Sequence, residues 1–149
     1  MTNVRIFMSF DLDHDQDLHD RLLQESRGRS AFAVANRSEG GAMTDQWSER
    51  VRARIAAADE VVVICGEHTD ESPRVSAELA IAREQHKPYM LLWGRRERMC
   101  KKPRSARADD GMYSWTPEIL QQQISYVLRR SRQPQVPEGM KRQAPTGRS

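Results

Sequence analysis

The chain has 149 residues, enough for one domain with its own hydrophobic core but short for two. Hydrophobic residues make up 38% of it, and its longest apolar runs have only four or five residues, whereas a membrane-spanning helix needs ~20. The first residues lack the apolar stretch of a secretion signal, and the two cysteines, Cys65 and Cys100, do not suggest a disulfide framework. We therefore expect a cytoplasmic location and no membrane partner.

The net charge of +3 is distributed unevenly along the chain. Residues 95–107 contribute +6 and residues 129–149 contribute +5, which leaves −8 for the remainder. This distribution describes two basic segments attached to an acidic domain, without a uniformly basic face, so no nucleic-acid partner is expected. The basic segment 95–107 is interpreted as a solvated loop, with phosphate binding as the alternative.

Hydrophobic periodicity predicts strands and helices in alternation. Strand patterns occupy residues 4–10, 31–35, 61–65 and 89–93, and helical patterns occupy 15–25, 44–57, 75–86 and 116–130. Residues 36–44, 66–73 and 95–115 are predicted to be irregular. From residue 131 onward, prolines and glycines among polar residues predict a disordered basic tail, so we expect a domain at 1–130 and a tail at 131–149.

This alternation predicts an α/β fold, in which helices cover both faces of a parallel sheet. The run Val61–Cys65 is apolar throughout, which is typical of a strand buried on both faces. In such sheets, ligands bind beyond the carboxyl ends of the strands, where the strand order reverses. Residues 9–13, 36–44, 66–73 and those after Gly94 are therefore expected to form the functional edge.

Several familiar chemistries lack their motifs. A P-loop and a Gly-x-Gly-x-x-Gly turn are both absent, which argues against P-loop nucleotidases and dinucleotide-binding dehydrogenases. A response-regulator receiver needs an aspartate after its third strand, where this chain has Cys65-Gly66. The histidines and cysteines lack the spacing of metal ligands, so no metal site is expected.

Two groups of motifs resemble a known family. The first comprises Phe7-Met8-Ser9-Phe10-Asp11, Asp45-x-Trp47, and then Thr69, Ser72, Val75 and Glu78. The second comprises Cys100-x-x-Pro103 and Asp110-x-Met112-Tyr113-x-Trp115-Thr116. In order and spacing, over roughly residues 4–130, they are similar to the TIR-like family of Thoeris antiphage systems. The resemblance implies a flavodoxin-like three-layer fold with a parallel sheet of four to five strands and helices on both faces.

The resemblance also implies a site. In TIR enzymes, a glutamate on the helix after the third strand acts on the ribose attached to nicotinamide, and Glu78 matches its position. A carboxylate there can stabilise the positive charge that develops as an N-glycosidic bond breaks. By the same resemblance, Ser9, Phe10 and Asp11 line the pocket, the loop that begins at Asn36 covers the dinucleotide, and Trp47 stacks on a ring.

Each of these residues also has a structural interpretation. Glu78 suits the solvated face of an amphipathic helix, and Asp11 suits a turn that caps the following helix. The spacing of Trp47 with Val51 and Ile55 favours packing onto the sheet. Phe10 fits the core and the pocket equally well.

The function implied by the resemblance is cleavage of the nicotinamide–ribose bond of NAD, by hydrolysis or by cyclisation into a cyclic ADP-ribose-type signal. NAD would be the substrate, self-association would control activity, and the signal would activate a partner effector in antiphage defence. One alternative is a non-catalytic TIR-like module for protein interaction or regulation. Another is a nucleoside deoxyribosyltransferase-like enzyme that acts on free nucleosides.

Overall fold

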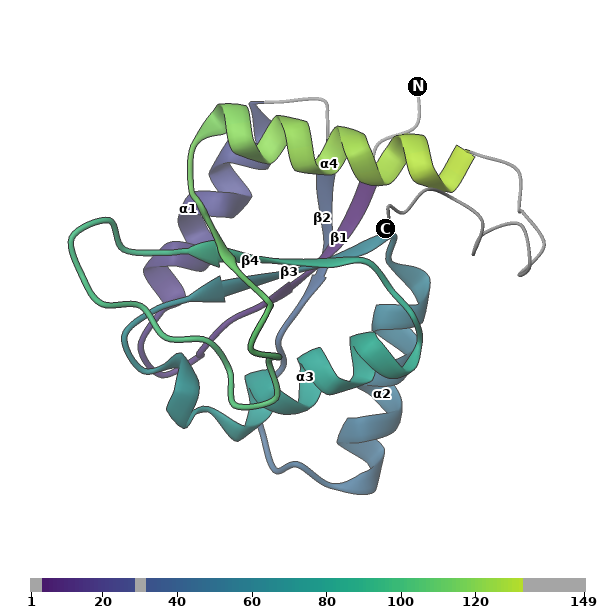
Figure 1. Cartoon of the computed structure of the whole chain (residues 1–149). Coiled ribbons are helices and arrows are strands. Elements are labelled where there is room, and N and C mark those ends of the chain that lie inside the picture. The colour runs from purple at the N-terminus through teal and green to yellow at the C-terminus, as the bar shows by residue number, and fades with distance from the viewer. Residues whose placement is uncertain (1–3, 29–31, 133–149) are drawn as a thin grey trace.

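The computed structural model describes residues 4–28 and 32–132. Strands and helices alternate along the chain (Figure 1). In order, the elements are β1 (Val4–Ser9), α1 (Gln16–Arg27), β2 (Phe32–Arg37), α2 (Asp45–Ala57), β3 (Glu60–Cys65), the short 3₁₀ helix η1 (Thr69–Glu71), α3 (Pro73–Glu84), β4 (Tyr89–Trp93), β5 (Met112–Ser114) and α4 (Pro117–Arg132).

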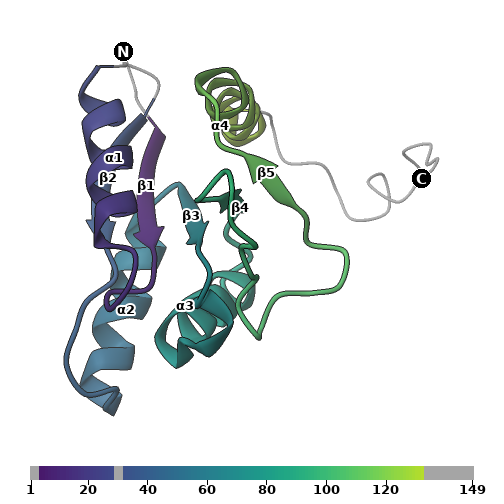
Figure 2. The same cartoon turned by 90° about the vertical axis from the view of Figure 1, so that its left-hand side faces the viewer.

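The strands of this part of the chain form one sheet in the order β2-β1-β3-β4-β5, with every neighbouring pair parallel (Figure 2). Helices α1 and α4 cover one face, and α2 and α3 cover the other (Figure 1). The predicted flavodoxin-like three-layer fold is therefore confirmed. Because β1 pairs with both β2 and β3, the strand order reverses beside β1, and the crevice of such folds lies beyond Ser9 and Cys65.

The core has two halves because successive strand side chains point to opposite faces of the sheet. In β3, Val62 and Ile64 pack toward α1 and α4, whereas Val61, Val63 and Cys65 pack toward α2 and α3. All six residues of β3 are buried, as the apolar run predicted for a strand covered on both sides.

Two expected loops contain strand residues. Strand β2 continues to Arg37, so Asn36 lies in the strand and pairs with Phe7, and the loop begins at residue 38. Residues 112–114, expected to be irregular, form the edge strand β5 beside β4. Asn36 and Arg37 have little strand preference and Met112–Ser114 is only three residues long, so in both segments backbone pairing to an existing parallel strand decides the conformation.

The register between β1 and β2 slips by one residue. Ile6 aligns with Val34 but Phe7 aligns with Asn36, so Ala35 is the extra residue of a bulge. A one-residue slip turns every later side chain to the other face of the sheet. Beyond the slip, Ser38 therefore follows the register of Ser9 on the α3 face, where it would otherwise have followed Phe10.

Within residues 4–28 and 32–132, no helix is both long and apolar enough to cross a bilayer. Helix α4 extends to Arg132, two residues past the expected boundary of the domain. The remainder of the predicted tail, residues 133–149, lies outside the described residues, as does Ala31 of the second predicted strand.

Gly94 is required where β4 ends against β3. A Cβ at this position would lie 2.7 Å from the carbonyl oxygen of Cys65 and 2.7 Å from a methyl group of Leu18. We expect Gly94→Ala to lower the free energy of unfolding by about 1–3 kcal/mol, because the backbone contact cannot relax without moving β3. Gly111→Ala is the control, since a Cβ there meets nothing within 4 Å. Equal stability of the two variants in urea denaturation would contradict this account.

Candidate active site

The carboxyl group of Glu78 lies where β1, the loop after β2 and α3 meet. The Ser72 hydroxyl caps α3 by accepting a hydrogen bond from the amide of Val75, and Pro73 occupies the first turn. Glu78 then falls on the helix face that packs against the sheet, with Val75 and Leu79, and its exposed fraction is 0%. The alternative of a solvated glutamate is therefore wrong.

Two serine hydroxyls bind this carboxyl group. Ser9 Oγ donates to Glu78 Oε1 at 2.5 Å, and Ser38 Oγ donates to the same oxygen at 2.7 Å. Ser38 in turn accepts a hydrogen bond from the amide of Phe10 at 3.0 Å, and its own amide donates to the carbonyl of Met8. Glu78 Oε2 is buried without a partner among the described residues. Oε1 thus accepts two hydrogen bonds, whereas Oε2 accepts none.

Burial raises the pKa of Glu78 from 4.5 to about 7. Desolvation disfavours the charged form, while the hydroxyls of Ser9 and Ser38 and the positive charge of Arg74 act in the opposite direction. Desolvation is the larger effect, so the group changes its protonation state near neutral pH. A carboxyl group with this property at the ligand-binding edge of a parallel sheet is a functional-site candidate.

Arg74 ties the loop of residues 38–44 to α3. Its guanidinium donates to the carbonyl of Glu39 at 3.0 Å and to that of Gly41 at 2.7 Å. The Glu39 carbonyl also accepts from Trp47 Nε1 at 3.1 Å, and the Glu39 carboxylate pairs with Arg50 and Arg54. Gly41 has a φ of +93°, a backbone conformation that suits glycine. The loop is therefore held closed over the end of β1.

A cavity of about 610 Å³ lies beside this closed loop. It is bounded by the turn after β1 (Asp11–His14), by Gly40 and Gly41 of the loop, and by residues 71–74 at the start of α3. Glu78 lies one helical turn beyond Arg74, on the same face of α3, but does not line the cavity. Glu78 is thus one helical turn from a residue that lines the cavity, but its carboxyl group is buried outside the lining.

The other predicted site residues lie at different depths. Asp11 lines the cavity but is only 5% exposed. Its side chain accepts a hydrogen bond from the amide of Asp13 and binds His14 Nδ1 at 2.7 Å.

Phe10 is 0% exposed and packs on the opposite face of the sheet, against His19. Trp47 is 2% exposed and packs in the core with Val51 and Ile55. Asn36 is half-buried in β2.

Of the predicted set, only Ser9 forms a side-chain hydrogen bond with Glu78. The structure adds Ser38 and Arg74, which the sequence interpretation did not select. Arg74 could have been found from its position four residues before Glu78, because residues at that spacing share a helix face. Ser38 gives no such signal, since its direction depends on the bulge at Ala35. Among the described residues, no three His, Cys, Asp or Glu side chains cluster as metal ligands would.

Comparison with known proteins places this site within a family match. The family model described as Thoeris protein ThsB, TIR-like domain, matches residues 7–98, which include Ser9, Ser38, Arg74 and Glu78. A solved structure described as a prokaryotic SEFIR domain has a similar fold, with a TM-score of 0.50 at 19% identity. That match covers 91% of this chain and 99% of the SEFIR chain. No curated protein matches the chain.

The protonation of Glu78 predicts a pH-dependent stability. The folded chain keeps this proton up to about pH 7, whereas the unfolded chain loses it near pH 4.5, so the contribution of this group to the unfolding free energy falls as pH rises between these values. Relative to wild type, Glu78→Gln is expected to gain ~1–3 kcal/mol between pH 4.5 and pH 8. The measurement is urea denaturation at several pH values.

Glu84→Gln is the matched control, because it removes a carboxylate of the same helix whose side chain is 56% exposed. Its stability profile should keep the wild-type shape. Parallel profiles for Glu78→Gln and wild type would show that Glu78 is not protonated in the folded chain at neutral pH.

The contacts of Arg74 predict how the loop responds to mutation. Arg74→Gln removes the charged donor to the carbonyls of Glu39 and Gly41, so amides of residues 38–44 should exchange with solvent about ten-fold faster. Hydrogen exchange followed by mass spectrometry measures this. Arg52→Gln, which removes an exposed ion pair with Glu84, is the control. Equal protection of the loop in both variants would exclude Arg74 as its main attachment.

Proposed function

The chain belongs to the family of the TIR-like domain of Thoeris protein ThsB, and on that premise we propose that it breaks the nicotinamide–ribose bond of NAD, with Glu78 as the reacting carboxylate. The observation that supports this most strongly is the buried carboxyl group of Glu78, which two hydroxyls hold beside a cavity of about 610 Å³. The site lies where the strand order reverses, the usual ligand position in sheets of this kind.

The proposed chemistry needs one carboxylate. As the bond between C1′ and the pyridinium nitrogen breaks, nicotinamide leaves with the electron pair, and positive charge develops on the ribose. Glu78 Oε2 has no partner in the closed site, so it is the oxygen available to face this charge. Water then captures C1′ and loses a proton, or a nitrogen of the adenine does so and gives a cyclic ADP-ribose-type signal for a partner effector.

The proposal requires the loop of residues 38–44 to open. With the loop closed, Glu78 is 0% exposed and cannot touch a substrate. Opening breaks the contacts of Arg74 with Glu39 and Gly41, removes Ser38 from Glu78 Oε1, and joins the carboxyl group to the cavity. Ser9 belongs to β1 and stays, so one hydroxyl continues to orient the carboxylate.

Activity is tested by nicotinamide release from NAD, measured by chromatography. The protein concentration is increased across the series, because self-association is expected to regulate the activity. Removing a carboxylate that stabilises transition-state charge should lower the rate by ~10²–10³-fold in Glu78→Gln. Ser9→Ala should also lower it, because the remaining carboxylate is then less well oriented. Glu84→Gln, an exposed change on the same helix, should leave the rate unchanged.

If Glu78→Gln released nicotinamide at the wild-type rate, Glu78 would not be the reacting carboxylate. Free nucleosides form a second arm of the assay: exchange of nucleobases without consumption of NAD would favour a deoxyribosyltransferase-like enzyme.

A non-catalytic module is the second candidate, and one observation favours it: the closed loop excludes solvent from Glu78 through several hydrogen bonds. In this case Glu78 is a structural group that joins α3 to β1 and the loop. Protection against phage that persists in cells carrying Glu78→Gln, with no nicotinamide release from wild type, would support the module and exclude the enzyme.

A further inference from the structure

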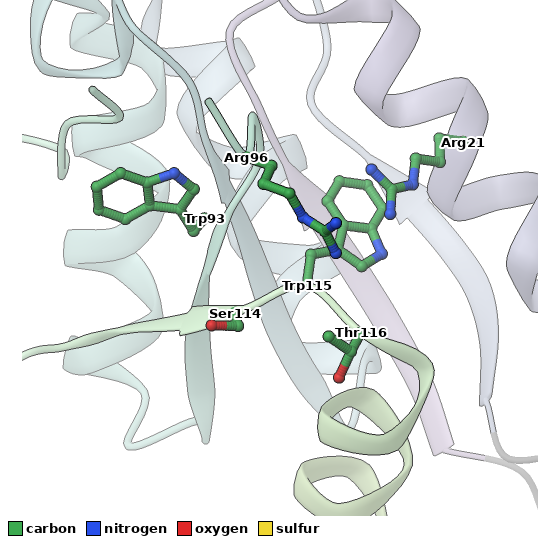
Figure 3. Close-up of a pocket in the computed structure, with 7 residues that line it drawn as sticks. Arg21, Trp93, Arg96, Ser114, Trp115 and Thr116 are labelled. Carbon is green, nitrogen blue, oxygen red and sulfur yellow. The ribbon is translucent and has the colours of Figure 1, made fainter. Parts of the chain in front are cut away.

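A second cavity, of about 620 Å³, lies at the same edge of the sheet, toward its α1 and α4 face (Figure 3). Its lining comes from α1, the end of β4, the basic segment that follows, and the segment joining β5 to α4. The residues are Arg21, Trp93, Gly94, Arg96, Ser114, Trp115 and Thr116. This lining includes two arginines and no acidic residue, although the domain outside its basic segments has an excess of acids.

The two arginines come from distant parts of the chain and converge on one tryptophan. The Arg21 guanidinium lies 4.1 Å from the centre of the Trp115 ring, a cation–π contact. Figure 3 shows the Arg96 side chain extended into the cavity, with its guanidinium directed toward the same indole. Arg21 is paired with Glu25, whereas Arg96 is exposed and has no carboxylate partner among the described residues, so an anion in the cavity would add the missing partner of Arg96.

Surrounding contacts position the Arg21 guanidinium and the turn that carries Arg96. Glu25 accepts a hydrogen bond from Trp115 Nε1 at 2.9 Å and pairs with Arg21 at 3.3 Å, which orients the indole and its stacked guanidinium. Next to Arg96, the Arg95 side chain binds Asp15 and Asp17, and its carbonyl accepts from Trp93 Nε1 at 2.8 Å. Arg96 has no ion-pair partner in the described part of the chain. Its exposed side chain therefore extends from an anchored turn without a carboxylate partner.

Two other lining residues carry hydroxyl groups. Ser114 ends β5 and is exposed, and Thr116 caps α4 by accepting from the amide of Ile119 at 3.1 Å. Guanidinium groups donate paired hydrogen bonds that match phosphate oxygens, and hydroxyls add further donors. From this combination we propose that the cavity is a binding site for a phosphate-bearing small molecule, with the phosphoryl group held between Arg21 and Arg96.

This site is separate from the one at Glu78. Trp115 belongs to the core half on the α1 and α4 side, whereas Glu78 and Trp47 belong to the α3 and α2 side. The proposal stands whether or not the chain cleaves NAD, because it depends only on charge and cavity shape at the other face. It also gives the basic segment 95–107 a ligand-binding role at Arg96 in place of a purely solvated loop.

The chain contains three tryptophans, and the NMR signal of each indole N–H can report binding near that residue. We would titrate ¹⁵N-labelled full-length protein with ADP, pyrophosphate and adenosine, after assigning the signals by Trp→Phe substitution. ADP and pyrophosphate are expected to shift the signal of Trp115 saturably and to leave that of Trp47 in place. Adenosine is expected to shift none of them, because it lacks the phosphate.

Variants locate the site. Arg96→Gln should weaken ADP binding at Trp115 at least ten-fold, since a charge-assisted pair of hydrogen bonds is lost. Arg98→Gln is the matched control, because Arg98 lies two residues away, is 66% exposed and faces Glu67. Arg74→Gln, on the Glu78 side, should also leave binding at Trp115 unchanged.

Three results would overturn the proposal. They are the absence of any shift at Trp115 with both phosphate probes, equal binding of adenosine and ADP, and equal weakening by Arg96→Gln and Arg98→Gln. A shift confined to Trp47 would place nucleotide binding at the Glu78 cavity alone. That outcome would separate the failure of this proposal from failure of the proposed function.

Discussion

A carboxyl group without access to water holds the functional edge of this domain together. Glu78 Oε1 accepts from Ser9 at the end of β1 and from Ser38 after β2, so one atom of α3 joins two neighbouring strands. The arrangement is costly for stability, because burial raises the pKa of Glu78 to about 7 and Oε2 has no partner in the described structure. An apolar side chain of similar volume would avoid both penalties. Costs of this kind are usual at functional sites.

Through its hydrogen bond with Ser38, Glu78 Oε1 links the conformation of the loop of residues 38–44 to the protonation of the carboxyl group. Ser38 binds Glu78 in the described conformation, and Arg74, one turn earlier on α3, holds residues 38–44 there through Glu39 and Gly41. Under the proposed function, opening admits water and removes the desolvation that raises the pKa, so the carboxyl group ionises as it meets the substrate. A negative charge is what a developing ribosyl cation requires. Closure then protects the fold from carrying that charge unpartnered.

Sequence reasoning predicted the fold well because the relevant signals are local and repeated. The apolar run Val61–Cys65 and the helical spacing around it define a parallel sheet almost by themselves, and the position of Glu78 on α3 follows. The neighbourhood of Glu78 was harder to predict. Ser38 reaches it because one extra residue, Ala35, turns the end of β2 to the other face, and such slips have no signature in composition or periodicity. Strand β5 was missed because pairing with β4, and not its own sequence, makes it a strand.

The basic segment shows how neighbouring residues of one charge run acquire different roles. Arg95 is neutralised by Asp15 and Asp17, and this contact fixes the segment against α1. Gly66 allows that contact, because a Cβ there would lie 2.3 Å from an oxygen of the buried Asp15 carboxylate. Arg96 then leaves this anchored turn toward Trp115 and Arg21, where no lining carboxylate compensates it. Arg95 and Arg96 count equally toward the net charge, but in the fold the ion pairs of Arg95 position the turn that carries Arg96. The proposed phosphate site therefore depends partly on acids that never touch the ligand, since Asp15 and Asp17, together with the hydrogen bond from Trp93 to the Arg95 carbonyl, position the turn from which Arg96 extends.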